Sequence, residues 1–277
     1  MHDVNANGAS IPALGFGTFR LPGPDVLKIL PHALKIGFRH IDTAQIYGNE
    51  AEVGDAIRLS AVARGDIFLT TKVWVENYRP AAFVTSVEES LAKLKTDYVD
   101  LLLLHWPNDA VPLADQVGAL NAVKDAGKVR HIGVSNFNTA LMAESIELST
   151  SPLITNQIEY HPYLDQTPIL QAAKEAGMAV TGYYGMADGK VFTDPLLKDI
   201  AASHNKSVAQ VVLRWLVQQD GIVALSKTVG EARASENIEI FDFALTAQEM
   251  VAVHALAKPD GRIVSPDGLA PVWDAAA

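Results

Sequence analysis

The chain has 277 residues, with 22 Lys and Arg residues against 32 Asp and Glu residues, and it contains no cysteine. The absence of cysteine excludes a disulfide framework, a thiolate metal site and a cysteine nucleophile. A formal net charge of -10 disfavours binding to nucleic acid or to an anionic membrane surface. No signal peptide is readable, and the most apolar stretch, 99–106, is too short to span a membrane, so we expect a cytoplasmic protein.

Short apolar segments rich in β-branched and aromatic residues alternate with helical patterns along the chain. The predicted strands are 14–19, 38–43, 67–73, 99–106, 129–136, 154–160, 178–184 and 222–227. The predicted helices are 25–36, 50–60, 80–94, 113–126, 140–148, 168–176 and 208–218. Continuously apolar strands indicate parallel strands covered by helices on both sides. We therefore expect an α/β fold, a single (β/α)8 TIM barrel domain over 1–277.

An open doubly wound sheet is the alternative α/β architecture. It would bind phosphate through a glycine-rich turn that leads from the first strand into a helix. Gly15 and Gly17 begin such a motif, but the third glycine is missing and Pro22 and Pro24 follow in place of a helix. The barrel is therefore favoured.

The last stretch, 258–277, is irregular and rich in proline and glycine. Leu269, Val272 and Trp273 give it apolar side chains that could be buried. An unattached terminus tends to be disordered, but these side chains favour a loop that folds over the mouth of the barrel.

Polar residues follow the predicted strands at their C-terminal ends, where barrel enzymes build their active sites. A single polar residue at a strand end is more often a turn or a cap, but seven positions in register favour a site. The positions are Asp42, Lys72, His105, Ser135 with Asn136, Gln157, Tyr183 and Lys227.

Asp42 and Lys72 lie on neighbouring predicted strands and could form a purely structural ion pair. The functional interpretation adds Tyr47, which follows Asp42 in the next loop. An adjacent ammonium lowers the pKa of a phenol from its ordinary value of about 10. We therefore expect Lys72, held by Asp42, to make Tyr47 a general acid.

His105 could hydrogen-bond a substrate oxygen, although by itself it could also be a core histidine. Trp74 and Trp106 follow Lys72 and His105 closely and would form flat apolar walls of a small-molecule pocket.

A proton donor without a nucleophile or a metal needs a second reactant, and hydride from a nicotinamide is the obvious complement. A basic pair, Lys227 and Arg233, lies beside a predicted short helix, where a phosphate could bind. The groups suited to the nicotinamide carboxamide and ring are Ser135, Asn136, Gln157 and Tyr183.

Five motifs spread over nearly the whole chain form a highly specific combination. They are GFRHIDTAQIYGNE at 37–50, TKVW at 71–74, DLLLLHWP at 100–107, GVSNF at 133–137 and NQIEY at 156–160. With these motifs the chain resembles the aldo-keto reductases. The resemblance implies a barrel that uses NADP(H), with Tyr47 as the acid, Asp42 and Lys72 tuning it, and His105 orienting the carbonyl.

The resemblance also extends to the cofactor site. The family pattern of Lys, Ser or Thr, four residues, Arg and then Glu-Asn implies binding by Lys227, Thr228, Arg233, Glu236 and Asn237. Two departures are Ser226, where many members have proline, and the segment 184–188, where many continue Ser-Pro-Leu after the tyrosine.

Within the family, the ending 262–274 is similar to that of the bacterial 2,5-diketo-D-gluconate reductases of the B type. This similarity places Trp273 in the substrate pocket with Trp74 and Trp106. The implied function is NADPH-dependent reduction of aldehydes and ketones to alcohols by a monomeric, metal-free enzyme. Expected substrates are α-dicarbonyls such as methylglyoxal, keto acids, and keto sugars such as 2,5-diketo-D-gluconate.

Two other functions remain open at this point. A metal-dependent barrel hydrolase could use His40, Asp42, His105, His131 and His161, although a paired His-x-His motif is absent. A nucleotide-binding redox sensor or regulatory subunit could keep the same barrel with slow turnover, but the intact catalytic set argues against it.

Overall fold

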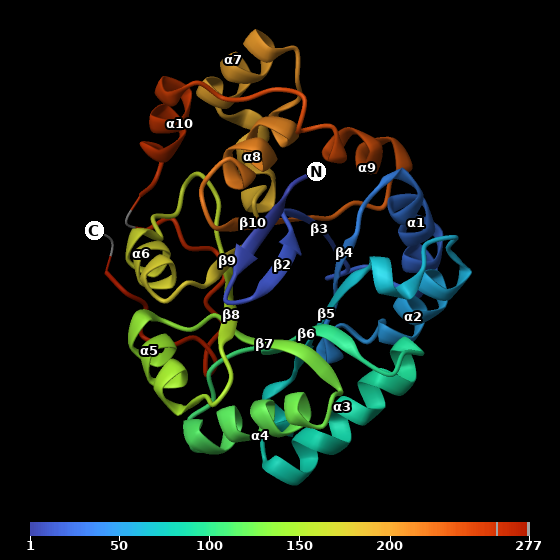
Figure 1. Ribbon diagram of the computed structural model, residues 1–277. Helices are drawn as coiled ribbons and strands as arrows, with labels where there is room; N and C mark the ends of the chain where they lie inside the picture. Colours follow the sequence, from blue (N-terminus) through green and yellow to red (C-terminus); the bar gives the residue numbers. More distant parts are fainter. Residues whose placement is uncertain (259, 276–277) are drawn as a thin grey trace.

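The computed structural model describes residues 1–258 and 260–275 and shows a ring of strands surrounded by helices (Figure 1). The strands close a barrel in the order β10-β3-β4-β5-β6-β7-β8-β9, and every neighbouring pair is parallel. This arrangement confirms the expected (β/α)8 TIM barrel. The strands are β3 (Leu14–Gly17), β4 (His40–Asp42), β5 (Phe68–Val73), β6 (Val99–Leu104), β7 (Val129–Ser135), β8 (Leu153–Glu159), β9 (Ala179–Tyr183) and β10 (Ile222–Ser226).

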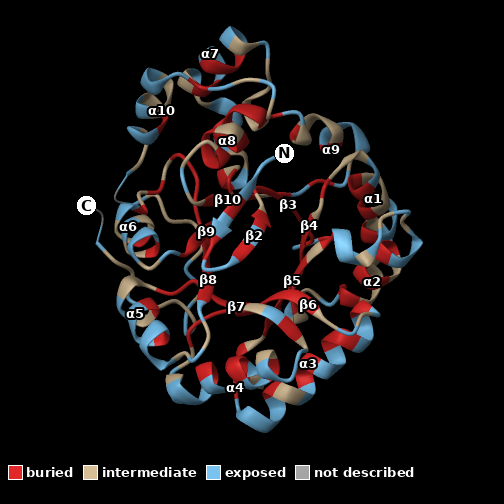
Figure 2. Cartoon of the chain, in the orientation of Figure 1, coloured by how far each residue is buried: buried red, intermediate tan, exposed pale blue. Residues whose placement is uncertain are grey.

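Helices cover the outside of the barrel, and their inner faces are buried while their outer faces are exposed (Figure 2). All the predicted helices are present, and the short helix expected after 230 is also found. They are α1 (Gly23–Ile36), α2 (Glu50–Leu59), α3 (Pro80–Leu94), α4 (Leu113–Asp125), α5 (Thr139–Leu148), α6 (Thr167–Glu175), α8 (Val208–Val217) and α9 (Glu231–Ile238).

Two helices are additional to the predicted ones, α7 (Pro195–His204) and α10 (Ala247–His254). Each begins at a side-chain cap: Asp194 accepts from the Leu197 N–H, and Thr246 forms a capping box with Glu249. Both caps are readable in the sequence. The (β/α)8 pattern requires one helix between β9 and β10, and the more apolar α8 already supplies it. For this reason the pattern does not predict α7.

A β-hairpin, β1 (Asp3–Ala6) and β2 (Ala9–Pro12), precedes the barrel. Its turn is Asn7-Gly8, with φ values of 44° and 86°, a pair of residues that favours tight hairpins. Asn7 Nδ2 donates to the Leu153 carbonyl oxygen at 2.8 Å, where β8 begins. The hairpin therefore covers the N-terminal end of the barrel, opposite the end where the predicted site residues lie.

Candidate active site

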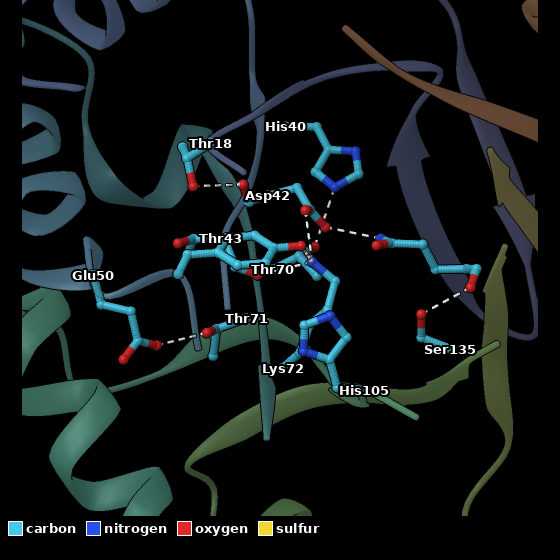
Figure 3. A network of polar contacts seen from close by, with 12 residues as sticks. Thr18, His40, Asp42, Thr43, Glu50, Thr70, Thr71, Lys72, His105 and Ser135 are labelled. Carbon is cyan, nitrogen blue, oxygen red and sulfur yellow. Dashed lines mark hydrogen bonds and ion pairs between the residues drawn. The ribbon is translucent and has the colours of Figure 1, made fainter. Parts of the chain in front are cut away.

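A buried ion pair lies at the C-terminal end of β4 and β5 (Figure 3). Lys72 Nζ is 2.6 Å from Asp42 Oδ1, and it also donates to the Thr43 carbonyl oxygen at 2.9 Å. The hydroxyl of Tyr47, in the short 3-10 turn η1 (Gln45–Tyr47), lies 3.4 Å from Lys72 Nζ. The structure therefore brings together the three residues that the sequence places in neighbouring strands and the following loop.

Burial decides the protonation of Tyr47 in this arrangement. Burial, and after it the Asp42 carboxylate, raises the pKa of Tyr47 well above its ordinary value of 10.0. The lowering expected from the sequence is therefore not found, because both causes of the shift disfavour the phenolate. Burial also lowers the pKa of Lys72, and Asp42 opposes that shift. The resting site thus holds a protonated phenol beside a lysine that is paired with a carboxylate.

His105 lies directly after β6 and faces the same space. Its ring is edge-on to the Tyr47 ring, with centroids 5.7 Å apart. Burial, followed by the charge of Lys72, lowers the pKa of His105 well below its ordinary value of 6.5. Its ring nitrogens have no hydrogen-bond partner among residues 1–258 and 260–275. His105 is therefore a neutral imidazole that is free to bind a small molecule.

Tryptophan side chains form the walls around this space. The Trp74 ring lies edge-on to His105 at 5.3 Å, and the Trp106 and Trp273 rings are 6.3 Å apart. Trp273 comes from the C-terminal segment, which folds over the mouth of the barrel as expected. Leu269 packs against the core, whereas Val272 is 89% exposed, so its predicted burial is wrong.

Four polar residues at the ends of β7, β8 and β9 form a connected hydrogen-bond network. Tyr183 donates through its hydroxyl to Asn136 Oδ1 at 2.6 Å, and Asn136 Nδ2 donates to Ser135 Oγ and to the His105 carbonyl oxygen. Gln157 Nε2 donates to Asp42 Oδ2 at 2.8 Å. The network links the expected nicotinamide-binding residues directly to the ion pair.

The expected phosphate-binding residues lie between β10 and α9. Lys227 and Arg233 are exposed, and neither forms an ion pair with any residue that the structure describes. The N-terminus of α9 has Gly230 at its cap and no side-chain cap. Two unpaired cations beside uncapped backbone N–H groups fit a phosphate group.

The remaining members of the expected cofactor set differ in exposure. Thr228 and Asn237 are buried, and Asn237 Nδ2 donates to Ser226 Oγ at 2.9 Å. Glu236 is half-buried, and its carbonyl oxygen accepts from Gln210 Nε2. The side chain of Asn237 therefore ties α9 to the end of β10, and so fixes the place of Arg233.

The histidines considered for a metal-dependent hydrolase are separated in the structure. His40 bonds Thr70 Oγ1, and His161 lies 2.9 Å from Glu159. Within 1–258 and 260–275, no group of three or more His, Cys, Asp or Glu side chains is arranged to hold a metal ion. None of the helices in those ranges is long and apolar enough to cross a membrane.

Two residues that shape the site, Gln45 and Tyr78, are not among the residues expected there from the sequence. Gln45 Oε1 accepts from the Trp74 N–H and from Asn77 Nδ2, so it joins the Tyr47 turn to the Trp74 wall. Tyr78 donates to the Trp106 carbonyl oxygen at 2.8 Å and accepts from its N–H at 3.2 Å. Only the fold shows these contacts, although Gln45 lies within the first family motif.

Comparisons with known proteins identify the family. The model of the Aldo/keto reductase family matches residues 13–258. Methylglyoxal reductase DkgB of Escherichia coli O157:H7 is 44% identical over 268 residues, covering 96% of this chain and all of the relative.

Two solved structures extend the comparison. A candidate 2,5-diketo-D-gluconic acid reductase B is 66% identical with a TM-score of 0.98, and the match covers 99% of this chain and 98% of that one. An aldo-keto reductase of Bombyx mori in complex with NADP is 31% identical with a TM-score of 0.87, over 92% of each chain. The chain therefore belongs to the aldo/keto reductase family, whose members are oxidoreductases.

Proposed function

We propose that this protein reduces small aldehydes and ketones to alcohols with NADPH. The observation that carries the proposal is the convergence of Tyr47, Lys72 and His105 at one end of the barrel, with the Tyr47 hydroxyl 3.4 Å from Lys72 Nζ. A bound nicotinamide would supply the hydride. The protein must then supply a proton, a place for the carbonyl oxygen and a pocket that excludes water.

Tyr47 is the proposed proton donor. Burial keeps its hydroxyl protonated until the carbonyl oxygen gains negative charge. The proton then moves from the Tyr47 hydroxyl to that oxygen, and the phenolate left behind faces the Lys72 ammonium. Asp42, itself held by Gln157, fixes the ammonium in place. Lys72 thus acts on the product of proton transfer more than on the resting phenol.

His105 is the proposed orienting group. Because its imidazole is neutral, it can donate one hydrogen bond to the substrate oxygen without competing as an acid. Its backbone is fixed by the Asn136 side chain, which donates to the His105 carbonyl oxygen at 3.0 Å. The oxygen would then lie between the Tyr47 hydroxyl and the His105 ring.

The cofactor would lie along the ends of β7 to β10. Ser135, Asn136 and Gln157 offer amide and hydroxyl groups for its carboxamide, and Tyr183 offers a ring for stacking. Its 2′-phosphate would meet Lys227 and Arg233, with Thr228, Glu236 and Asn237 completing the adenosine side.

The substrate class follows from the pocket walls and from the relatives. The Trp74 ring packs against His105, and the Trp106 and Trp273 rings pack against each other, so flat apolar rings border the catalytic groups. The relatives described above are named for methylglyoxal and for 2,5-diketo-D-gluconic acid. We therefore propose α-dicarbonyls, keto acids and keto sugars as the substrates.

A substrate panel with both cofactors tests the proposal. Methylglyoxal, phenylglyoxal, 2,5-diketo-D-gluconate and simple aldehydes are incubated with NADPH or NADH, and oxidation of the cofactor is followed together with alcohol formation. We expect turnover with NADPH for several compounds and much weaker turnover with NADH. Absence of alcohol product from every compound with either cofactor would overturn the proposal.

A further inference from the structure

The C-terminal segment 260–275 supplies one wall of the pocket, and its attachment to the barrel centres on a buried carboxylate. Glu159, the last residue of β8, is fully buried. Its Oε1 accepts from the Ile263 N–H at 2.8 Å, and its Oε2 accepts from the Val264 N–H at 2.9 Å. Both oxygens of one core side chain are therefore bound to the backbone of the segment.

The same carboxylate has two charged or polar neighbours. His161 Nε2 lies 2.9 Å from Oε1, and Arg262 Nη1 lies 3.8 Å from Oε2. A buried carboxylate is stable only when hydrogen bonds and ion pairs compensate its lost hydration. Loss of the Glu159 charge would therefore weaken its contacts with the backbone N–H groups, His161 and Arg262 together. Glu159 is thus tied to the segment both through backbone N–H groups and through an ion pair.

The entry of the segment is also fixed in space. The Lys258 N–H donates to the Tyr163 carbonyl oxygen at 3.1 Å. A Cβ atom at Gly261 would lie 1.8 Å from that same oxygen, so no side chain fits there. The chain therefore reaches Glu159 along a close path that only glycine permits.

A direct line of contacts leads from Glu159 to the pocket. The Arg262 guanidinium lies 3.6 Å from the centroid of the Trp273 ring, and Trp273 packs edge-on against Trp106. At the far end of the segment, Asp274 accepts from the Thr139 N–H and hydroxyl at the start of α5. Beside Trp273, Asn138 Nδ2 donates to the Val272 carbonyl oxygen, and the Trp273 indole N–H donates to Ser265 Oγ. Among these attachments, Glu159 is the one in the barrel core.

We propose that Glu159 is a positioning residue for substrate selection, acting through Arg262 to fix the Trp273 wall. This proposal rests on the proposed carbonyl reductase function for its kinetic test only. It assigns Glu159 no contact with substrate or cofactor. Its expected signature is a change in selectivity between small and large substrates that disappears when the tryptophan ring is removed.

The test compares Glu159→Gln, Trp273→Ala and the double variant with methylglyoxal and phenylglyoxal. In the wild-type background, Glu159→Gln should lower kcat/KM for phenylglyoxal relative to methylglyoxal by roughly three- to tenfold, mainly through KM. In the Trp273→Ala background the same substitution should leave that ratio unchanged. Equal ratios in all backgrounds would overturn the proposal.

Asp100→Asn is the matched control. Asp100 is also a buried carboxylate at a barrel strand, and it binds Arg64 and Arg130, both at 2.9 Å, at the opposite end of the barrel. The Asp100→Asn substitution should lower the melting temperature without changing the ratio of kcat/KM for phenylglyoxal to that for methylglyoxal. If Asp100→Asn changes the ratio as much as Glu159→Gln, the effect is general loosening and the proposal fails.

Hydrogen exchange of the segment 262–274 provides a measurement that needs no turnover. Glu159→Gln should speed exchange at Ile263 and Val264, whereas Asp100→Asn should not. Arg262→Met serves as a second variant if Glu159→Gln does not fold, because it breaks the link to Trp273 and leaves the backbone contacts of Glu159 in place. Unchanged selectivity in Arg262→Met with normal folding would contradict the proposed route.

Discussion

Lys72 is a cation with no exposure to water, and its three N–H groups account for most of the site geometry. They face Asp42 Oδ1, the Thr43 carbonyl oxygen and the Tyr47 hydroxyl at 2.6, 2.9 and 3.4 Å. A buried ammonium without such partners would lose its proton or destabilise the fold. The longest of the three contacts is with the proposed proton donor. The attraction between the ammonium and the Tyr47 oxygen would strengthen there as the phenolate forms.

Tyr47→Phe removes the proposed donor and keeps the ring that packs against Phe19 and His105. We expect reduction to fall by about 10²–10⁴-fold, the usual contribution of general acid catalysis. Binding of NADPH, measured by fluorescence titration, should be unchanged. A variant with wild-type kcat, under conditions where chemistry limits the rate, would show that another group donates the proton.

His105 should tolerate an amide better than a methyl group. His105→Gln can still donate a hydrogen bond to the substrate oxygen, whereas His105→Ala cannot, so the glutamine variant should retain roughly tenfold more kcat/KM. Steady-state kinetics with methylglyoxal measures the difference. Equal activity of the two variants would mean that His105 serves the packing around Trp74 rather than the substrate.

The identity of these residues could be predicted from the sequence, but their electrostatics could not. Asp42, Lys72 and His105 end successive strands, and parallel strands bring such ends together whatever the details of packing. The pKa of Tyr47 depends on how far the folded loops remove its hydroxyl from solvent, which local sequence does not encode. For the same reason the contacts of Gln45 and Tyr78 follow only from the folded loops.

At the scale of elements, the connection from β10 to α9 places two exposed cations beside a helix N-terminus. The two cations, Lys227 and Arg233, lie on either side of Gly230, which caps α9 without a side-chain oxygen. Helix N-termini attract anions through unpaired backbone N–H groups. Two cations without an ion pair at this helix N-terminus are therefore expected to favour a phosphorylated cofactor.

Arg233→Ala should therefore collapse the proposed preference for NADPH over NADH. One charge-assisted hydrogen bond contributes about 1.5–3 kcal/mol, so the dissociation constant for NADPH should rise by roughly ten- to a hundredfold. The dissociation constant for NADH should change little, because NADH has no 2′-phosphate. Calorimetry with both cofactors provides the measurement, and equal weakening of the two would place the phosphate site elsewhere.

Elements with a strong periodic pattern could be predicted, and those defined by tertiary contacts could not be delimited. The strand predicted over 99–106 ends at Leu104, because His105 and Trp106 turn into the pocket. The hairpin, α7 and α10 each carry a local signal, but none is required by eight repeated strand and helix units. In the sequence, such additional elements can therefore be recognised only by their helix caps and tight turns.

At the scale of the whole molecule, the two ends of the barrel are covered by different parts of the chain. The N-terminal hairpin closes one end, and the C-terminal segment lies over the other, beside Trp106. The interior between them contains His40 and His105, whose pKa values burial lowers. Protonation of these histidines therefore couples the stability of the entire barrel to pH.

His40 gives this coupling a specific prediction. Burial lowers its pKa from the ordinary value of 6.5 to about 4, and His105 shifts in the same direction. Between pH 6.5 and about pH 4, His40 is protonated more readily in the unfolded chain than in the folded one. The free energy of unfolding is therefore retained above pH 6.5 and is lost as the pH falls toward 4.

The shift at His40 corresponds to about 3 kcal/mol once the pH is well below 4. We expect the free energy of unfolding, measured with urea, to fall between about pH 7.5 and about pH 4.5. His40→Gln keeps a polar group near Thr70 Oγ1 but cannot titrate, so its loss over that interval should be smaller by about 2 kcal/mol. The substitution also lowers stability at neutral pH, and for that reason the test compares slopes rather than absolute values. An identical pH dependence in the two proteins would mean that His40 takes up a proton as readily in the folded barrel as in the unfolded chain. Other groups would then cause the unfolding of the barrel in acid.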